Sequence, residues 1–91
     1  MEFIDRKYVA RIKNSPYFLL FSWNKIPSEE NTGSQCMISF HYQFPNPDLG
    51  NVSIYAAQNI LEEDLMYAGL NGLDASLVEI VEVEVNYKIK E

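Results

Sequence analysis

The chain has 91 residues and a net charge of −6, and 47% of its residues are hydrophobic. This length suits one domain with a modest core, and the apolar content is too high for a disordered chain. No apolar run is long enough for a membrane span or a secretory signal, and the lone Cys36 fits a reducing compartment. We therefore expect a single domain, residues 1–91, that is cytoplasmic and binds no membrane.

Three strands are predicted in the first half of the chain. Residues 3–13 and 17–26 alternate between apolar and polar side chains, less cleanly than the third segment. That segment, residues 35–44, places Ile38, Phe40, Tyr42 and Phe44 on one face and Ser39, His41 and Gln43 on the other. The polar, turn-rich segments 27–34 and 45–51 are interpreted as exposed loops.

One helix is predicted after the second loop. Its apolar stripe consists of Ile54, Ala57, Leu61, Leu65 and Ala68, at spacings of three or four. Asn51 or Ser53 is the candidate cap at its start, and Gly69 or Gly72 the candidate stop at its end. In the alternative interpretation, residues 52–56 form a short strand and the helix starts later.

The most regular alternation lies in residues 77–91, which we interpret as a long strand. Its apolar parity holds Leu77, Val81, Val83, Val85, Tyr87 and Ile89, and its charged or polar parity holds Glu82, Glu84, Asn86, Lys88 and Lys90. A strand with this pattern presents one apolar face and one face to solvent.

The element order β-β-β-α-β predicts an α+β fold, in which an antiparallel sheet of about four strands carries one helix on one face. The last strand should pair with the first. We expect that pairing to bring Lys7, Arg11 and Lys13 opposite Glu82 and Glu84 on the solvent side. In the core, we expect Leu61 and Leu65 to pack against Phe40, Tyr42 and Val83.

The residue inventory argues against catalysis. His41 is the only histidine and Cys36 the only cysteine, and they lie on opposite faces of one predicted strand, where they cannot act as base and nucleophile. A four-ligand zinc site and a phosphate-binding glycine motif are both missing. Glu82 and Glu84 share a face, but ordinary ion pairs explain them better than carboxylate catalysis. We expect no enzymatic activity and neither a metal ion nor another cofactor.

The charge distribution indicates the kind of partner. Residues 26–87 contain no Lys or Arg, and their acidic residues are Glu29, Glu30, Asp48, Glu62, Glu63, Asp64, Asp74, Glu79, Glu82 and Glu84. Such a surface repels nucleic acid and attracts basic protein surfaces. We hypothesise a non-enzymatic protein-binding module or inhibitor, similar in composition to the small acidic anti-defence proteins of phages and other mobile elements. The expected partner-binding residues are Glu29 and Glu30, in an exposed loop, and Glu62, Glu63 and Asp64, on an exposed turn of the helix mostly away from its apolar stripe.

Other interpretations stay open at this point. The acidic surface could serve solubility alone. The terminal strand Leu77–Ile89 could pair with the sheet of a neighbour, which would make the protein a homodimer or an assembly subunit. A third alternative is a small-molecule pocket between helix and sheet, lined by Trp23, Tyr42 and Tyr67.

Overall fold

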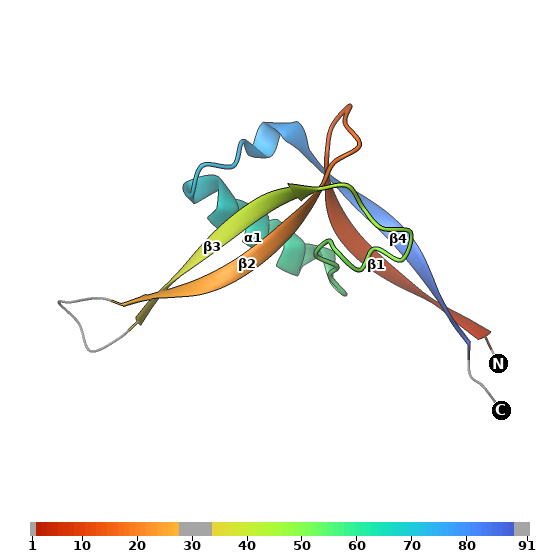
Figure 1. Ribbon diagram of the computed structural model, residues 1–91. Helices are drawn as coiled ribbons and strands as arrows, with labels where there is room; N and C mark the ends of the chain where they lie inside the picture. The colour runs from red at the N-terminus through yellow and green to blue at the C-terminus, as the bar shows by residue number, and fades with distance from the viewer. Residues whose placement is uncertain (1, 28–33, 89–91) are drawn as a thin grey trace.

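The computed structural model describes residues 2–27 and 34–88 and shows a four-stranded antiparallel sheet with one α-helix. The elements are β1 (Glu2–Ile12), β2 (Phe18–Pro27), β3 (Ser34–Gln43), α1 (Gln58–Leu70), the short 3₁₀ helix η1 (Ala75–Leu77) and β4 (Val78–Lys88). The strand order is β3-β2-β1-β4 (Figure 1). The predicted α+β fold and the pairing of the last strand with the first are confirmed.

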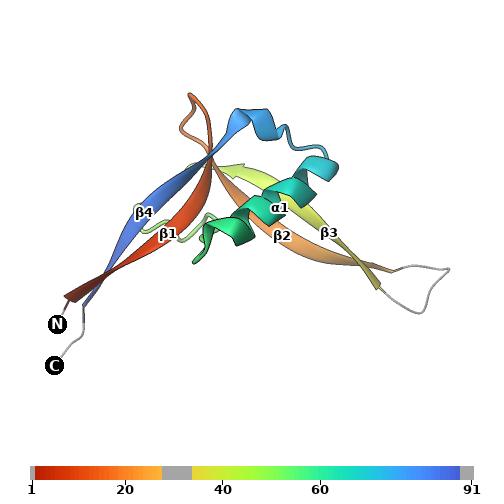
Figure 2. The same cartoon turned by 180° about the vertical axis from the view of Figure 1, so that it is seen from behind.

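The sheet consists of two long ribbons that diverge from one corner (Figures 1 and 2). β1 pairs with β4, and β2 with β3, along their whole lengths. Between β1 and β2, by contrast, the ladder is confined to Arg11 and Phe18, next to the connecting turn. The molecule measures 55 × 35 × 22 Å and has a radius of gyration of 15.7 Å. A compact chain of this length would have a radius of about 12 Å.

Residues 53–55 occupy the space where β1 and β2 separate. The amide of Ser53 donates to the carbonyl of Leu19 at 3.1 Å, and the amide of Phe21 donates to Ser53 Oγ at 2.8 Å. Tyr55 then exchanges two backbone hydrogen bonds with Tyr8 of β1, at 2.8 and 2.9 Å. These bonds pair backbone groups that the divergence of the strands would otherwise leave unsatisfied.

The helix therefore begins later than the capping pattern predicted, as in the alternative interpretation. The short strand of that alternative is wrong, because residues 52–56 make only an isolated β-bridge, between Tyr55 and Tyr8. Ala57 is the N-cap and offers no side-chain hydrogen bond, so neither Asn51 nor Ser53 caps α1. Asn51 instead stabilises the preceding loop, where its side chain accepts from the amide of Asn46 and donates to the carbonyl of Phe44.

The end of α1 agrees with the sequence pattern. Gly72 has φ +105°, the left-handed region in which glycine is favoured. The amide of Leu73 donates to the carbonyl of Ala68 at 3.0 Å, and the amide of Gly72 donates to the carbonyl of Gly69 at 3.3 Å. This pair of bonds is a Schellman motif. It confirms Gly72 as the residue that stops the helix and directs the buried Leu73 back toward the core.

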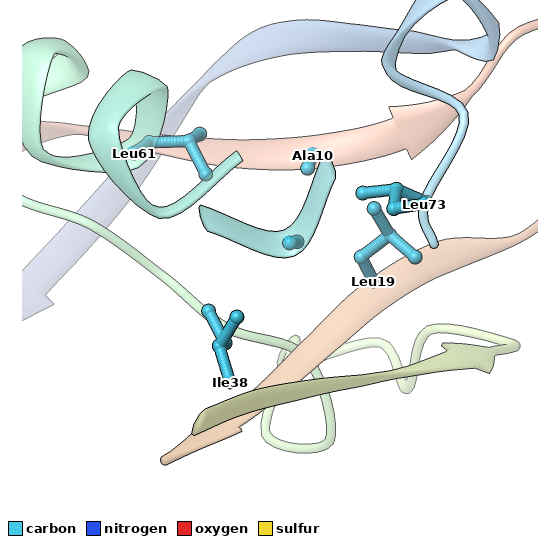
Figure 3. Close-up of a cluster of buried hydrophobic side chains, with 6 residues drawn as sticks. Ala10, Leu19, Ile38, Leu61 and Leu73 are labelled. Atoms are coloured by element: carbon cyan, nitrogen blue, oxygen red, sulfur yellow. The ribbon is translucent and has the colours of Figure 1, made fainter. Parts of the chain in front are cut away.

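The main core lies between α1 and the inner parts of the strands (Figure 3). It consists of Ala10, Leu19, Ile38, Leu61, Ala68 and Leu73. The apolar stripe of the helix is thus confirmed at Leu61 and Ala68, with Leu65 and Phe40 packed at the margin. Tyr42 is 56% exposed, so its predicted place in the core is wrong.

The apolar face of β4 points away from the helix. The register pairs Val9 with Val81 and Ala10 with Ile80, so residues of equal parity share a face. Since Ala10 and Ile80 face the core under α1, Val81, Val83 and Val85 lie on the opposite face together with the fully buried Val9. Figure 1 shows the connection from β3 to α1 crossing this face. The predicted packing of Val83 against Leu61 and Leu65 is therefore wrong.

The same register changes the ion pairs between β1 and β4. Lys7 and Arg11 lie on the opposite face from Glu82 and Glu84, so that predicted pairing is wrong. The salt bridges among the described residues include Arg11–Glu79 at 2.5 Å, Arg6–Glu82 at 3.5 Å and Lys7–Asp5 at 2.9 Å. Lys13 donates to the backbone carbonyl of Ser76 instead of to a carboxylate.

Candidate protein-binding surface

Of the predicted acidic site residues, Asp64 has a structural role. Its side chain is half-buried, and its Oδ2 accepts a hydrogen bond from the hydroxyl of Tyr55 at 2.5 Å. Burial, and then the hydrogen bond and charge of Asp64, raise the pKa of Tyr55 far above its usual value. Asp64 therefore attaches α1 to the extended segment before it, and its predicted exposed position is wrong. Glu29 and Glu30 lie outside the described residues.

Glu62 and Glu63 are exposed on α1, as predicted. Glu62 accepts a hydrogen bond from Gln58 one turn earlier, at 3.1 Å. Within the described residues, no cation forms a salt bridge with either carboxylate. Several of the other acidic side chains are already engaged: Glu79 and Glu82 pair with arginines, while Asp48 and Asp74 accept local hydrogen bonds. Glu62 and Glu63 are thus available to an external cation.

The same helix exposes large apolar side chains. Ile60, Met66, Tyr67 and Leu70 are all exposed, and Leu70 is the most exposed of them at 78%. At about 100° per residue, all four positions fall in the half of the helix opposite Leu61. Soluble domains seldom concentrate apolar residues on the solvent side of a helix, and such patches are typical of binding sites.

Trp23 extends this apolar surface from the helix onto β2. Its ring packs edge-to-face against Tyr67, with centroids 5.7 Å apart, and it remains 47% exposed. We name the combined set, Trp23, Ile60, Glu62, Glu63, Met66, Tyr67 and Leu70, the α1 surface. The predicted stripe facing the core omitted the apolar members of this surface. The signal for them was that α1 is apolar on more than one side.

Two other predicted features lie elsewhere. His41 is exposed on the face of β3 that points away from the helix, opposite Leu20 of β2. Of the suggested pocket residues, Trp23 contacts Tyr67, whereas Tyr42 contacts Phe40. A polar depression lies near the β1–β2 turn and is lined by Arg11, Lys13, Asn14, Ser15 and Glu79. Its two cations are already engaged by Glu79 and by the carbonyl of Ser76.

Within residues 2–27 and 34–88, no group of three His, Cys, Asp or Glu side chains is arranged to hold a metal ion. No helix in the described part of the chain is long and apolar enough to cross a membrane. Compared with known proteins, the chain matches no protein-family model, no curated protein and no solved structure.

Proposed function

We propose that the protein is a non-enzymatic protein-binding module, and that the α1 surface binds a partner protein whose basic side chains surround an apolar patch. The observation that carries this proposal is the cluster of exposed apolar side chains on α1 and Trp23, next to two carboxylates that form no salt bridge with any described residue. A charged surface kept only for solubility would not need exposed Trp23, Tyr67 and Leu70.

The two kinds of side chain would contribute differently. Trp23 and Tyr67 are of the residue types that dominate binding energy, and they already pack against each other, so little side-chain order is lost on binding. Glu62 and Glu63 are adjacent and repel each other; a basic partner would remove that repulsion and form charge-assisted hydrogen bonds. Charges of this kind mainly raise the association rate and select the partner. The acidic pair therefore assists an apolar centre.

A protein that binds nucleic acid through a basic surface fits this description of the partner. Occupation of that surface by the module would exclude the nucleic acid and make the module an inhibitor. The net charge of −6 and the absence of Lys and Arg from residues 26–87 support attraction to such a partner. We place this interaction in the cytoplasm, which suits a chain with a single cysteine.

The test is affinity capture from the native host, followed by titration of the captured protein with purified variants. We expect Tyr67→Ala to weaken binding by about tenfold or more, since truncation of a central aromatic residue is usually costly. Glu63→Lys should weaken binding and reduce its dependence on salt. Glu84→Lys is the matched control: it makes the same change of charge at an exposed site on β4. If Tyr67→Ala and Glu63→Lys both bind as the wild type does, the proposal is wrong.

A further inference from the structure

The two edges of the sheet differ sharply in charge. β4 forms one edge and carries Glu79, Glu82, Glu84 and Lys88. β3 forms the other edge, and its sequence SQCMISFHYQ contains no Asp, Glu, Lys or Arg. Natural edge strands are protected against pairing by charge, proline, a bulge or short length. β3 has none of these protections, since all 10 of its residues pair with β2 in continuous register.

The outer side of β3 is open in the described structure. Its ladder partner is β2, and no other described element forms a backbone hydrogen bond with residues 34–43. In an antiparallel ladder, alternate residues direct their N–H and C=O groups to opposite sides of the strand. β3 therefore presents a row of backbone donors and acceptors along about 33 Å, at about 3.3 Å per residue.

We propose that β3 pairs with β3 of a second copy of this chain, antiparallel and about a two-fold axis, so that the two sheets become one continuous sheet. The pairing places residues of equal parity opposite each other and both helices on the same side. With the axis at Ser39, near the middle of β3, Ile38 meets Phe40 of the second copy on the helix side, and Met37 meets His41 on the other side. Aromatic and β-branched pairs of this kind stabilise a ladder, and no like charges oppose each other.

The charges on the strands indicate that the open edge of β3 pairs with β3 of a second copy. A ladder between β4 strands of two copies would be less favourable, because a two-fold axis near Val83 would set Glu82 opposite Glu84 of the partner strand. A basic strand would find no carboxylate on β3 with which to pair. Contact between β3 of one copy and β4 of the next would generate an open filament, whereas β3 with β3 closes as a dimer.

The size of the contact is sufficient for a specific dimer. A ladder of roughly eight to ten residues supplies about as many backbone hydrogen bonds, which is the number found in a typical protein interface. Tyr42 and Met37, which are 56% and 42% exposed, would be covered further. The elongated shape of the single chain, with a radius of gyration of 15.7 Å, also leaves more surface to bury by association than a compact domain would.

The test is sedimentation equilibrium of the full chain over a range of concentrations. We expect a monomer–dimer equilibrium in the wild type. His41→Lys introduces a cation on each β3, two residues from the two-fold axis and opposite Met37 of the second copy, and should raise the dissociation constant by about tenfold or more. Asn59→Lys makes the same change of charge at an exposed position on α1 and should leave the dissociation constant unchanged. Circular dichroism checks that both variants are folded.

Amide hydrogen exchange locates the interface independently of substitutions. At concentrations that favour the dimer, alternate amides of β3 should become protected while those of β4 exchange as in the monomer. A wild type that stays monomeric at its highest soluble concentration overturns the proposal. So does dissociation by Asn59→Lys with no effect of His41→Lys, which would place the interface on α1. The proposed partner binding at the α1 surface is tested by other variants, so either proposal can fail alone.

Discussion

Leu61→Ala is expected to lower the free energy of unfolding by about 2–4 kcal/mol. Leu61 is fully buried, in a cluster that also holds Leu19 of β2 and Ala10 of β1. Loss of the side-chain carbons forfeits about 2.4 kcal/mol of transfer free energy, at about 0.8 kcal/mol per carbon. The remainder comes from the cavity. Because Leu19 and Ala10 belong to separate ribbons that diverge, the walls of this cavity cannot readily collapse.

Urea denaturation at a fixed protein concentration measures this change, and the fixed concentration keeps any contribution of self-association constant. Leu70→Ala is the matched control, since it removes the same atoms from a side chain of α1 that is 78% exposed. It should change stability by less than about 0.5 kcal/mol. A domain of this size has roughly 5–14 kcal/mol in total, so the loss at Leu61 will be readily measured. Equal effects of the two variants would refute the placement of the helix on the sheet.

Gly72→Ala should destabilise the protein by about 1 kcal/mol, because Gly72 has a positive φ that alanine disfavours. Gly69→Ala, which has open space at its Cβ position inside the helix, should stabilise the protein by about 0.5 kcal/mol. Denaturation midpoints of the two variants that move in the same direction would contradict this prediction. Tyr55 has a raised pKa, so the folded protein keeps a proton that the unfolded chain releases above about pH 10, and stability should fall as pH rises beyond that value. The loss cannot exceed about 1.4 kcal/mol per pH unit because only one proton is involved, and the partial exposure of Tyr55 should make the total loss smaller. Tyr55→Phe should show a smaller alkaline loss than the wild type, and an equal loss would exclude this origin.

The sequence pattern predicted a residue's position correctly where that position depends on the residue's own segment alone. The alternation of residues 35–44 correctly predicted that Ile38 is buried and His41 exposed, but Tyr42 and Phe44 of the apolar parity are exposed. Gly72 was a candidate helix stop because a positive φ favours glycine, whatever the rest of the chain does. The exposure of Glu62 and Glu63 followed from their positions away from the apolar stripe.

Prediction was less successful where a residue has a distant partner. Asp64 belongs to the same acidic run as Glu62 and Glu63, but the hydroxyl of Tyr55 holds it in a half-buried position. The contact between Trp23 and Tyr67 joins β2 to α1, and no spacing in the sequence specifies it. The apolar part of the α1 surface was therefore missed, while its acidic part was found.

The sequence by itself determined the α+β class and the charge of each strand, because both depend on residue type and periodicity along one segment. The strand order was also predicted correctly, but the ion pairs expected between the first and last strands are not the ones observed. Only the tertiary structure decided which face of β4 meets the helix, since a shift of register by one residue exchanges the two faces. The residue at which α1 begins was also determined by the tertiary structure. Where β1 and β2 diverge, their unpaired backbone groups require Ser53 and Tyr55 to be extended, and this requirement overrides the helical periodicity that begins at Ile54.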